Sequence, residues 1–468
     1  MLEKPTWQIQ PNLENGEQHT QRNFSFFRCH LVVISVVAII VLAIAFTGLY
    51  ASTFRSHRIH FWTHGPFNFE CGIYRDFAFG NPITSTTSDK LPKHFLVVVL
   101  YPRIHQLLTS LFPITDSPLV CATLGGMTIF IFGLWIGAKT KWAPVVFPVI
   151  MLLGFSFTTW YVSSVWESRA FIMLGAVLLL LAIDRFLGSP TAVNLLLSIL
   201  ASVFSSLITI GNVYLIPLVP LAILFRARRI GLFKTIRWIF AYLLSLTLII
   251  ALIYEIFGFT VNPRTRLHEL FRISVHEQDQ IGATTARLNL GNYRNVAIQI
   301  LVYGVGGLYL PFGSSVSSQE WAIPKSYQAY LHHTPGVIFL VGYVSLILLT
   351  LISACRHRLW RREPLLLIII VWAFLYISFF VYFNPWAGPV YAAELMPALW
   401  AFIGIALGSL PHRRLPLGFL LVLALVVAWN NFTVIRYFKY HYGTSPDRMN
   451  ITEAGLVPKE PVFRCKWQ

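Results

Sequence analysis

Residues 31–50 of the chain read LVVISVVAIIVLAIAFTGLY. This stretch carries no charged side chain, and a helix of its length, at about 1.5 Å per residue, spans the roughly 30 Å hydrocarbon core of a bilayer. The tail before it is mostly polar, so we expect no cleavable signal and a first helix that stays in the membrane. Residues 1–30 are then predicted to form a cytoplasmic tail.

The composition of the whole chain agrees with this start. Of its 468 residues, 56% are hydrophobic and only 12% are charged, whereas about 25% are charged in soluble domains. Backbone in lipid must satisfy its own hydrogen bonds, which favours helices. The net charge of +17 comes from short basic runs between apolar segments, which is a topology signal and not a nucleic-acid surface. We therefore predict an all-α polytopic membrane protein with no nucleic-acid partner.

The basic runs orient the predicted helices, because short cytoplasmic loops are enriched in Lys and Arg. The strongest runs lie at 226–237, 356–362 and 413–414. With these runs inside, the sequence predicts about eleven transmembrane helices. They cover residues 31–50, 118–138, 143–161, 169–183, 192–209, 212–225, 237–256, 336–355, 364–382, 393–410 and 415–434. The membrane domain is thus residues 31–434, with two large external loops, 51–117 and 257–335, and an external tail, 435–468.

Two apolar stretches in these loops are predicted not to span. Residues 94–111 are interrupted by Pro102, Arg103 and His105, which favours an amphipathic helix at the interface. Residues 296–311 would place the basic run at 356–362 outside if they crossed the membrane. We therefore expect an interfacial or re-entrant segment there.

The acidic residues fall mostly on the external side of this topology. Only five of the 19 Asp and Glu lie inside: Glu3, Glu14, Glu17, Asp184 and Glu363. Three others, Glu167, Glu255 and Glu394, are predicted at external helix ends, where ionisable groups usually face a cavity of the bundle. Any chemistry is therefore expected outside.

The first external loop contains the densest polar motif, FWTHGPFNFECGIYRDFAFGNP at residues 61–82. Within it, Glu70 is followed by Gly72 and Tyr74, and Asp76 comes soon after. An acidic residue, a glycine and a tyrosine at this spacing after the first helix resemble the signature of the GT-C superfamily of polyprenyl-phosphate-sugar-dependent glycosyltransferases. That superfamily includes protein mannosyltransferases and aminoarabinose transferases.

Two further motifs resemble the same superfamily. Glu167-Ser168-Arg169-Ala170-Phe171 opens an apolar helix and is similar to the Ala-Arg-Ser-Tyr-Ala-Leu start of the fourth helix. Tyr391-Ala392-Ala393-Glu394-Leu395-Met396-Pro397 resembles an Arg-Tyr-hydrophobic-x-x-x-Pro pattern. The chain departs from the family at two positions, with Glu70 where Asp is usual and Val390 where Arg is usual.

The resemblance implies an inverting transfer of a hexose or pentose from a polyprenyl-phosphate donor to a glycan, lipid or protein acceptor. It places the active site on the outer face of a plasma membrane, which we take to be bacterial. Glu70 becomes the general base, with Asp76 second, and Arg169 and Arg75 become ligands of the donor phosphate. The remaining candidates for substrate binding are Tyr74, His64, Glu167, Tyr391 and Glu394.

Simpler interpretations of these residues stay open. Glu70 and Asp76 can be solvated loop carboxylates neutralised by Arg75, and Arg169 can be a helix-end arginine paired with Glu167. No cofactor follows with certainty. A divalent cation on His64, His332 and His333 with the carboxylates lacks tight ligand spacing. A disulfide between Cys71 and Cys465 would tie the C-terminal tail to the first loop.

The alternative function is a transporter or flippase of a lipid-linked or small polar substrate. Such a protein would place ionisable or helix-breaking residues near the middle of paired helices. The sequence instead places its carboxylates at external helix ends, and Gly211 and Asn212 indicate a turn between two spans. This pattern favours the enzyme.

Overall fold

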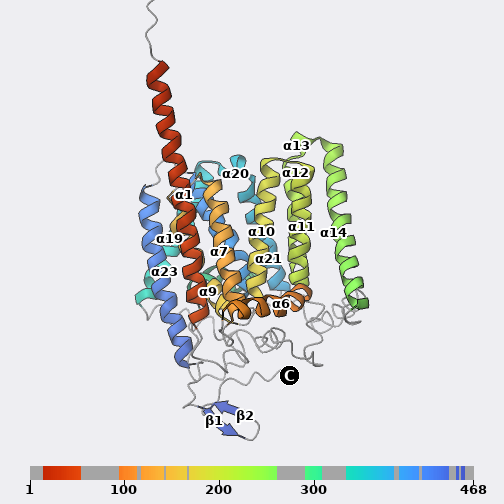
Figure 1. The fold of residues 1–468 in the computed structure, drawn as a ribbon, viewed down its shortest axis with the longest axis vertical. Coiled ribbons are helices and arrows are strands. Elements are labelled where there is room, and N and C mark those ends of the chain that lie inside the picture. Colours follow the sequence, from red (N-terminus) through yellow and green to blue (C-terminus); the bar gives the residue numbers. More distant parts are fainter. Residues whose placement is uncertain are drawn as a thin grey trace, which may run out of the picture.

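The computed structural model describes residues 14–53, 94–112, 118–141, 144–165, 168–260, 290–307, 334–383, 389–409, 414–441, 449–452 and 455–458. These residues are almost entirely helical and form one bundle (Figure 1). The protein is an all-α, multi-pass membrane protein. A two-stranded antiparallel ribbon is the one departure among the described elements, formed by β1 (Met449–Thr452) and β2 (Gly455–Pro458).

In the first half of the chain, successive long helices run between the two ends of the bundle. The elements of this half are α1 (Glu14–Thr53), α6 (Phe95–Leu111), α7 (Leu119–Lys139), α8 (Val146–Phe155), α9 (Phe157–Ser164), α10 (Arg169–Gly188), α11 (Ala192–Ile208), the 3₁₀ helix η1 (Ile210–Leu215), α12 (Leu218–Phe225), α13 (Ala227–Ile230) and α14 (Leu232–Thr260). Figure 1 shows α6 lying across the lower end of the bundle, as predicted for an interfacial helix.

The second half adds α16 (Leu290–Ala297), the π-helical η4 (Ile298–Tyr303), α17 (Gly304–Gly306), α19 (Thr334–Arg356), α20 (Leu359–Arg362), α21 (Pro364–Phe383), the 3₁₀ helix η6 (Pro389–Glu394), α22 (Leu395–Gly408) and α23 (Arg414–His441). The N-terminal part of α1 and the β1–β2 ribbon lie at opposite ends of the bundle (Figure 1). The helix α1 begins at Glu14, well before residue 31, and no proline lies within it.

Eight of the described helices are long and apolar enough to cross a membrane. A ninth crossing follows if α8 and α9 form one bent span. The predicted eleven would also require α11 and the η1–α12 pair, which are shorter. The predicted span 143–161 is wrong as a single straight helix, since the chain bends by 56° between Phe155 and Phe157.

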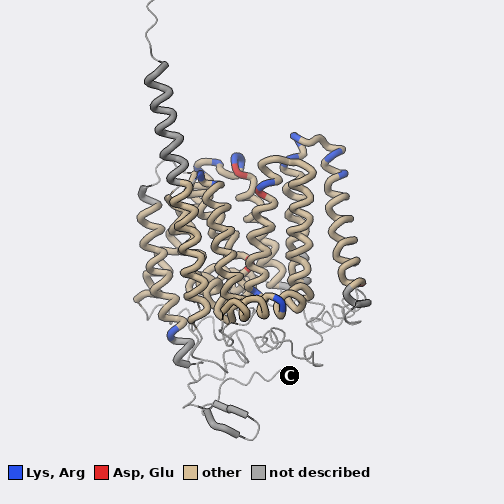
Figure 2. Tube along the Cα trace, viewed as in Figure 1, with Lys and Arg blue, Asp and Glu red and all other residues tan. Residues whose placement is uncertain are grey.

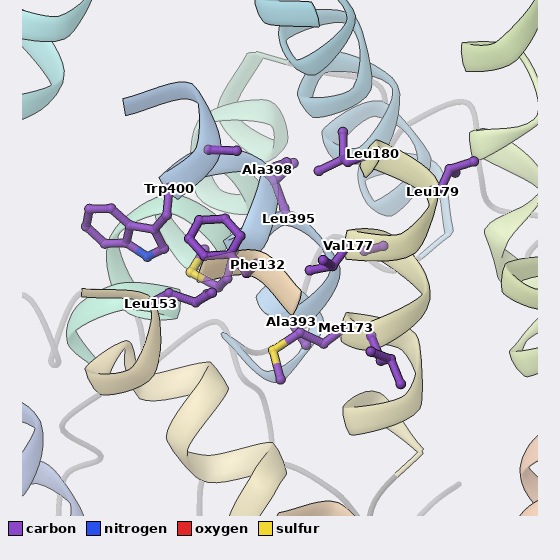
Figure 3. Close-up of a cluster of buried hydrophobic side chains, with 14 of the residues drawn as sticks. Phe132, Leu153, Met173, Val177, Leu179, Leu180, Ala393, Leu395, Ala398 and Trp400 are labelled. Atoms are coloured by element: carbon purple, nitrogen blue, oxygen red, sulfur yellow. The ribbon is translucent and has the colours of Figure 1, made fainter. Parts of the chain in front are cut away.

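The core of the bundle lies around α10 and the η6–α22 segment. Buried residues make up 78% of the α10 span and 89% of the Tyr391–Gly408 span, against 17% for α14 at the edge. Figure 3 shows the apolar side chains of this core, including Met173 of α10 beside Ala393 of η6. Both are fully buried. The core therefore positions η6 against α10.

The bend between α8 and α9 leaves carbonyl groups that lipid cannot hydrogen-bond. Side chains from other helices satisfy them. Tyr50 Oη donates to Gly154 O at 2.8 Å, and Asn431 Nδ2 donates to Phe155 O at 2.6 Å. Trp400 Nε1 donates to Ser156 Oγ at 2.9 Å. Side chains from α1, α22 and α23 therefore form hydrogen bonds to the carbonyls and to the serine hydroxyl at the bend.

Residues 296–307 are largely buried in the bundle and end beside this bend. Asn431 Nδ2 also donates to Val305 O at 2.6 Å, and Asn430 Nδ2 donates to Gly306 O at 2.7 Å. A Cβ on Gly304 would lie 2.5 Å from Ala392 Cβ, so only glycine allows this approach to η6. The two asparagines of α23 therefore join both irregular segments of the bundle.

Replacing Asn431 with Leu is expected to lower the free energy of unfolding by roughly 2–4 kcal/mol, because two buried carbonyls lose their donor. The matched control is Thr433→Val, two residues further along α23, whose hydroxyl bonds only Trp429 O of its own helix. Tryptophan fluorescence during thermal unfolding in detergent measures the difference. Equal midpoints for the two variants would contradict this role of Asn431.

Candidate active site at the start of α10

A buried ion pair joins the start of α10 to the end of η6. Arg169 Nη1 lies 3.0 Å from Glu394 Oε1, and the two residues are 225 positions apart in the chain. The side chain of Arg169 is 15% exposed and that of Glu394 is 3% exposed. Removing one partner of such a buried pair strongly destabilises the protein, because the other charge then remains buried without compensation.

The ring of Tyr391 holds the guanidinium from its other side. Arg169 Cζ lies 4.2 Å from the ring centroid, within the range of a cation–π contact. Phe380 of α21 packs on the same ring with the centroids 5.0 Å apart. Tyr376, also of α21, donates a hydrogen bond from its hydroxyl to the carbonyl of Tyr391. Two residues of α21 therefore position η6.

The electrostatic setting of Arg169 is unusual for a helix start. A helix N-terminus carries partial positive charge and favours anions, and α10 has no acidic residue in its first turn. Glu394 supplies the missing negative charge from another element. Its second oxygen, Oε2, is buried and has no hydrogen-bond partner among the described residues. That oxygen can accept one more hydrogen bond.

The site lies at the end of the bundle where α1 ends at Thr53. Trp160 Nε1 of α9 donates to Oγ1 of Thr53, the last residue of α1, at 2.8 Å. The helix α10 begins shortly after α9 ends, and α6 lies across this same end (Figure 1). The end of α1 and Arg169 therefore lie at the same end of the bundle, with α9 in contact with both helices.

The interfacial helix α6 brings a single charged residue to this face, the exposed Arg103. His105 of the same helix is buried, and burial lowers the pKa of its imidazole. His105 is therefore neutral at pH 7. The exposed apolar residues of α6, Leu107 and Leu111, fit a helix that rests on lipid.

The structure brings together three of the residues that the sequence singled out, Arg169, Tyr391 and Glu394. The others lie outside the described residues: Glu70, Asp76, Arg75, Tyr74, His64 and Glu167, together with His332, His333, Cys71 and Cys465. Among the described residues, no group of three His, Cys, Asp or Glu side chains could hold a metal ion. The predicted pairing of Arg169 with Glu167 is thus untested, whereas the Glu394 pair is observed.

The sequence did not point to Tyr376, Asn430 or Asn431. A usable signal did exist, since each is a polar side chain inside an otherwise apolar span, where polar groups usually have partners. Asn431 also matches the glycosylation triplet Asn-Phe-Thr, but its side chain is fully buried in the bundle. Its role in the described structure is therefore internal hydrogen bonding.

A second ion cluster lies at the opposite end of the bundle. Lys139 Nζ lies 2.7 Å from Asp184 Oδ1 and 2.8 Å from Glu363 Oε2, and Trp135 Nε1 donates to Asp184 Oδ2 at 3.0 Å. These contacts join the ends of α7, α10 and α21. Lys139 is balanced by two carboxylates, so this cluster is a structural clamp.

Comparison with protein-family models, curated proteins and solved structures found no match to this chain.

Replacing Tyr391 with Leu is expected to cost about 1–2 kcal/mol of stability, because Arg169 loses the ring that faces its guanidinium. Tyr391→Phe keeps the ring and is the control, and it should retain most of the stability. Thermal unfolding of both variants in the same detergent measures this. A Tyr391→Leu variant as stable as Tyr391→Phe would show that the ring contact contributes nothing.

Proposed function

We propose that the protein is an integral-membrane glycosyltransferase that uses a polyprenyl-phosphate sugar donor at the external face of the plasma membrane. It transfers a hexose or pentose, with inversion, to a hydroxyl of a glycan, lipid or protein acceptor. The observation that carries the proposal is Arg169, which pairs with Glu394 and Tyr391 at a helix start, at the end of the bundle where α1 also ends. Such a cation suits a phosphate at headgroup depth.

We infer eleven crossings, with residues 1–30 in the cytoplasm of a bacterium and the site facing outward. The inference counts the bent α8–α9 pair, α11 and η1–α12 together with the eight long spans. Lys and Arg positions gather at the end of the bundle that bears α13 and α20 (Figure 2), as the positive-inside rule predicts for the cytoplasmic side. An odd number of crossings also agrees with the opposite positions of α1's start and the β1–β2 ribbon.

In the proposed reaction, Glu70 accepts the proton of the acceptor hydroxyl as its oxygen bonds to the anomeric carbon. The bond between that carbon and the phosphate oxygen breaks on the opposite side, and the lipid phosphate leaves. Arg169 and Arg75 stabilise the charge of this leaving group. Asp76 positions the acceptor.

The remaining candidates would position the sugar and the acceptor. They are Tyr74, His64, Glu167, Tyr391 and Glu394. Glu394 has a second task, because its ion pair orients the guanidinium of Arg169 before the donor binds. A preformed cation of this kind needs little reorganisation during the reaction.

One observation favours the alternative, a transporter or flippase. Transporters bind substrate at discontinuous helices, and this bundle has a bend between α8 and α9 and a π-helical turn in η4. However, the carbonyls of Gly154 and Phe155 at the bend already accept hydrogen bonds from Tyr50 and Asn431. The bend is better explained as a sealed structural feature, which favours the enzyme.

The test is transfer from polyprenyl-phosphate hexoses and pentoses, labelled in the sugar, by the purified protein in liposomes. Envelope lipid, glycan and protein fractions serve as acceptors. Glu70→Gln should lower transfer by roughly 10²–10⁴-fold, because it removes the proton acceptor and keeps the side-chain size. Asp76→Asn should cost less, and Arg169→Ala should cost more than Arg169→Lys, which keeps the charge.

Thermal unfolding of each variant separates a loss of chemistry from a loss of folding. A larger defect in Asp76→Asn than in Glu70→Gln would make Asp76 the base. Full transfer by both variants would refute the proposed roles of the loop carboxylates. Movement of intact labelled donor across the bilayer, without transfer, would support the flippase.

A further inference from the structure

A cationic patch lies where α12, α13 and α14 meet, at the end of the bundle away from the candidate active site (Figure 2). Its five members, called the α13 patch here, are Arg226, Arg228, Arg229, Lys234 and Arg237. Four of them are exposed, and Arg226 is half-buried. The chain has no Asp or Glu between Asp184 and Glu255, so no carboxylate near in sequence neutralises the patch.

The local backbone holds these cations close together. Arg226 follows α12, and the backbone N–H of Arg229 donates to Arg226 O at 2.8 Å, so both arginines belong to one tight turn. Gly231, with φ of +83°, then reverses the chain into α14. Lys234 Nζ lies 4.7 Å from the centroid of the Trp238 ring, which fixes its ammonium at the start of α14.

Arg226 is incompletely paired in this turn. Its Nε atom is buried and has no hydrogen-bond partner among the described residues. Burial lowers the pKa of its guanidinium, and the charge of Arg229 lowers it further, while Glu363 raises it. Glu363 also forms a 2.8 Å ion pair with Lys139, so its charge is shared. An additional anion beside Arg226 and Arg229 would relieve their repulsion.

The surface of α14 next to the patch is apolar and exposed. Leu232, Phe233, Ile236 and Phe240 of α14 are 73%, 82%, 60% and 64% exposed, respectively. Leu232 and Phe233 lie at the start of α14 among the cations, and Ile236 and Phe240 continue along this helix at the edge of the bundle (Figure 1). A free phosphate gains nothing from contact with this apolar surface, whereas the acyl chains of a lipid pack against it. Cations beside exposed apolar side chains match a lipid that has an anionic headgroup and acyl chains.

We propose that the α13 patch binds an anionic phospholipid of the adjacent leaflet. Its phosphate contacts Arg226 and Arg229, and its acyl chains lie along Ile236 and Phe240, further down α14. The proposal concerns a site separate from the candidate active site and does not depend on the proposed function.

Native mass spectrometry of the delipidated full-length protein, titrated with phosphatidylglycerol or phosphatidylcholine, tests the site. The wild type should retain phosphatidylglycerol preferentially. The Arg226→Gln/Arg229→Gln variant should bind it at least tenfold more weakly, since each cation near a charged membrane surface contributes about a fivefold factor in affinity. Arg226→Lys/Arg229→Lys keeps the charge and should retain most of the binding.

The matched control is Arg103→Gln/Arg436→Gln, which removes two exposed cations from the α6 end of the bundle. It should bind phosphatidylglycerol like the wild type. Equal retention of the two lipids by the wild type would overturn the proposal, and so would an equal loss in the control. Displacement of the lipid by soluble glycerol phosphate at equal concentration would show that the acyl chains contribute nothing and would also contradict it.

Discussion

The ion pair between Arg169 and Glu394 is the interaction on which the candidate active site depends. Each of these charges, buried alone at the end of a span, would be costly to keep in the membrane. Together they join the start of α10 to η6, and Tyr391 covers the guanidinium at 4.2 Å. The pair thereby joins a helix start and a 3₁₀ turn into one polar site at the end of the bundle.

The rest of the bundle follows from a related constraint, because lipid offers no hydrogen bonds to irregular backbone. The bend after α8 and the segment that ends at Gly306 both expose carbonyls, and Asn430 and Asn431 of α23 satisfy them. These bonds let irregular backbone lie inside the bundle with its carbonyls paired. The irregular segments are therefore explained by packing, and the Arg169–Glu394 pair at the bundle end stays the candidate site.

Much of this fold could be predicted from the sequence, because long apolar runs and basic loops follow the bilayer. The all-α class and the helix α6 across the bundle end were predicted in this way. The bend between Phe155 and Phe157 was not, since its apolar flanks resemble one continuous span. Arg169, Tyr391 and Glu394 were each singled out, but their contacts join residues far apart in the chain. Hydropathy and spacing carry no information on such pairing, and the same holds for Tyr376 against the Tyr391 carbonyl.

The most direct test of this account is a double-mutant cycle between Arg169 and Glu394. The unfolding free energies of Arg169→Gln, Glu394→Gln and the double variant are measured in mixed micelles with increasing SDS. Each single variant leaves one buried charge unpaired, whereas the double variant leaves none. We predict that the double variant loses less stability than the sum of the single losses, by about 2 kcal/mol or more. Single losses that add to within about 0.5 kcal/mol would contradict the account, because the two side chains would then not depend on each other.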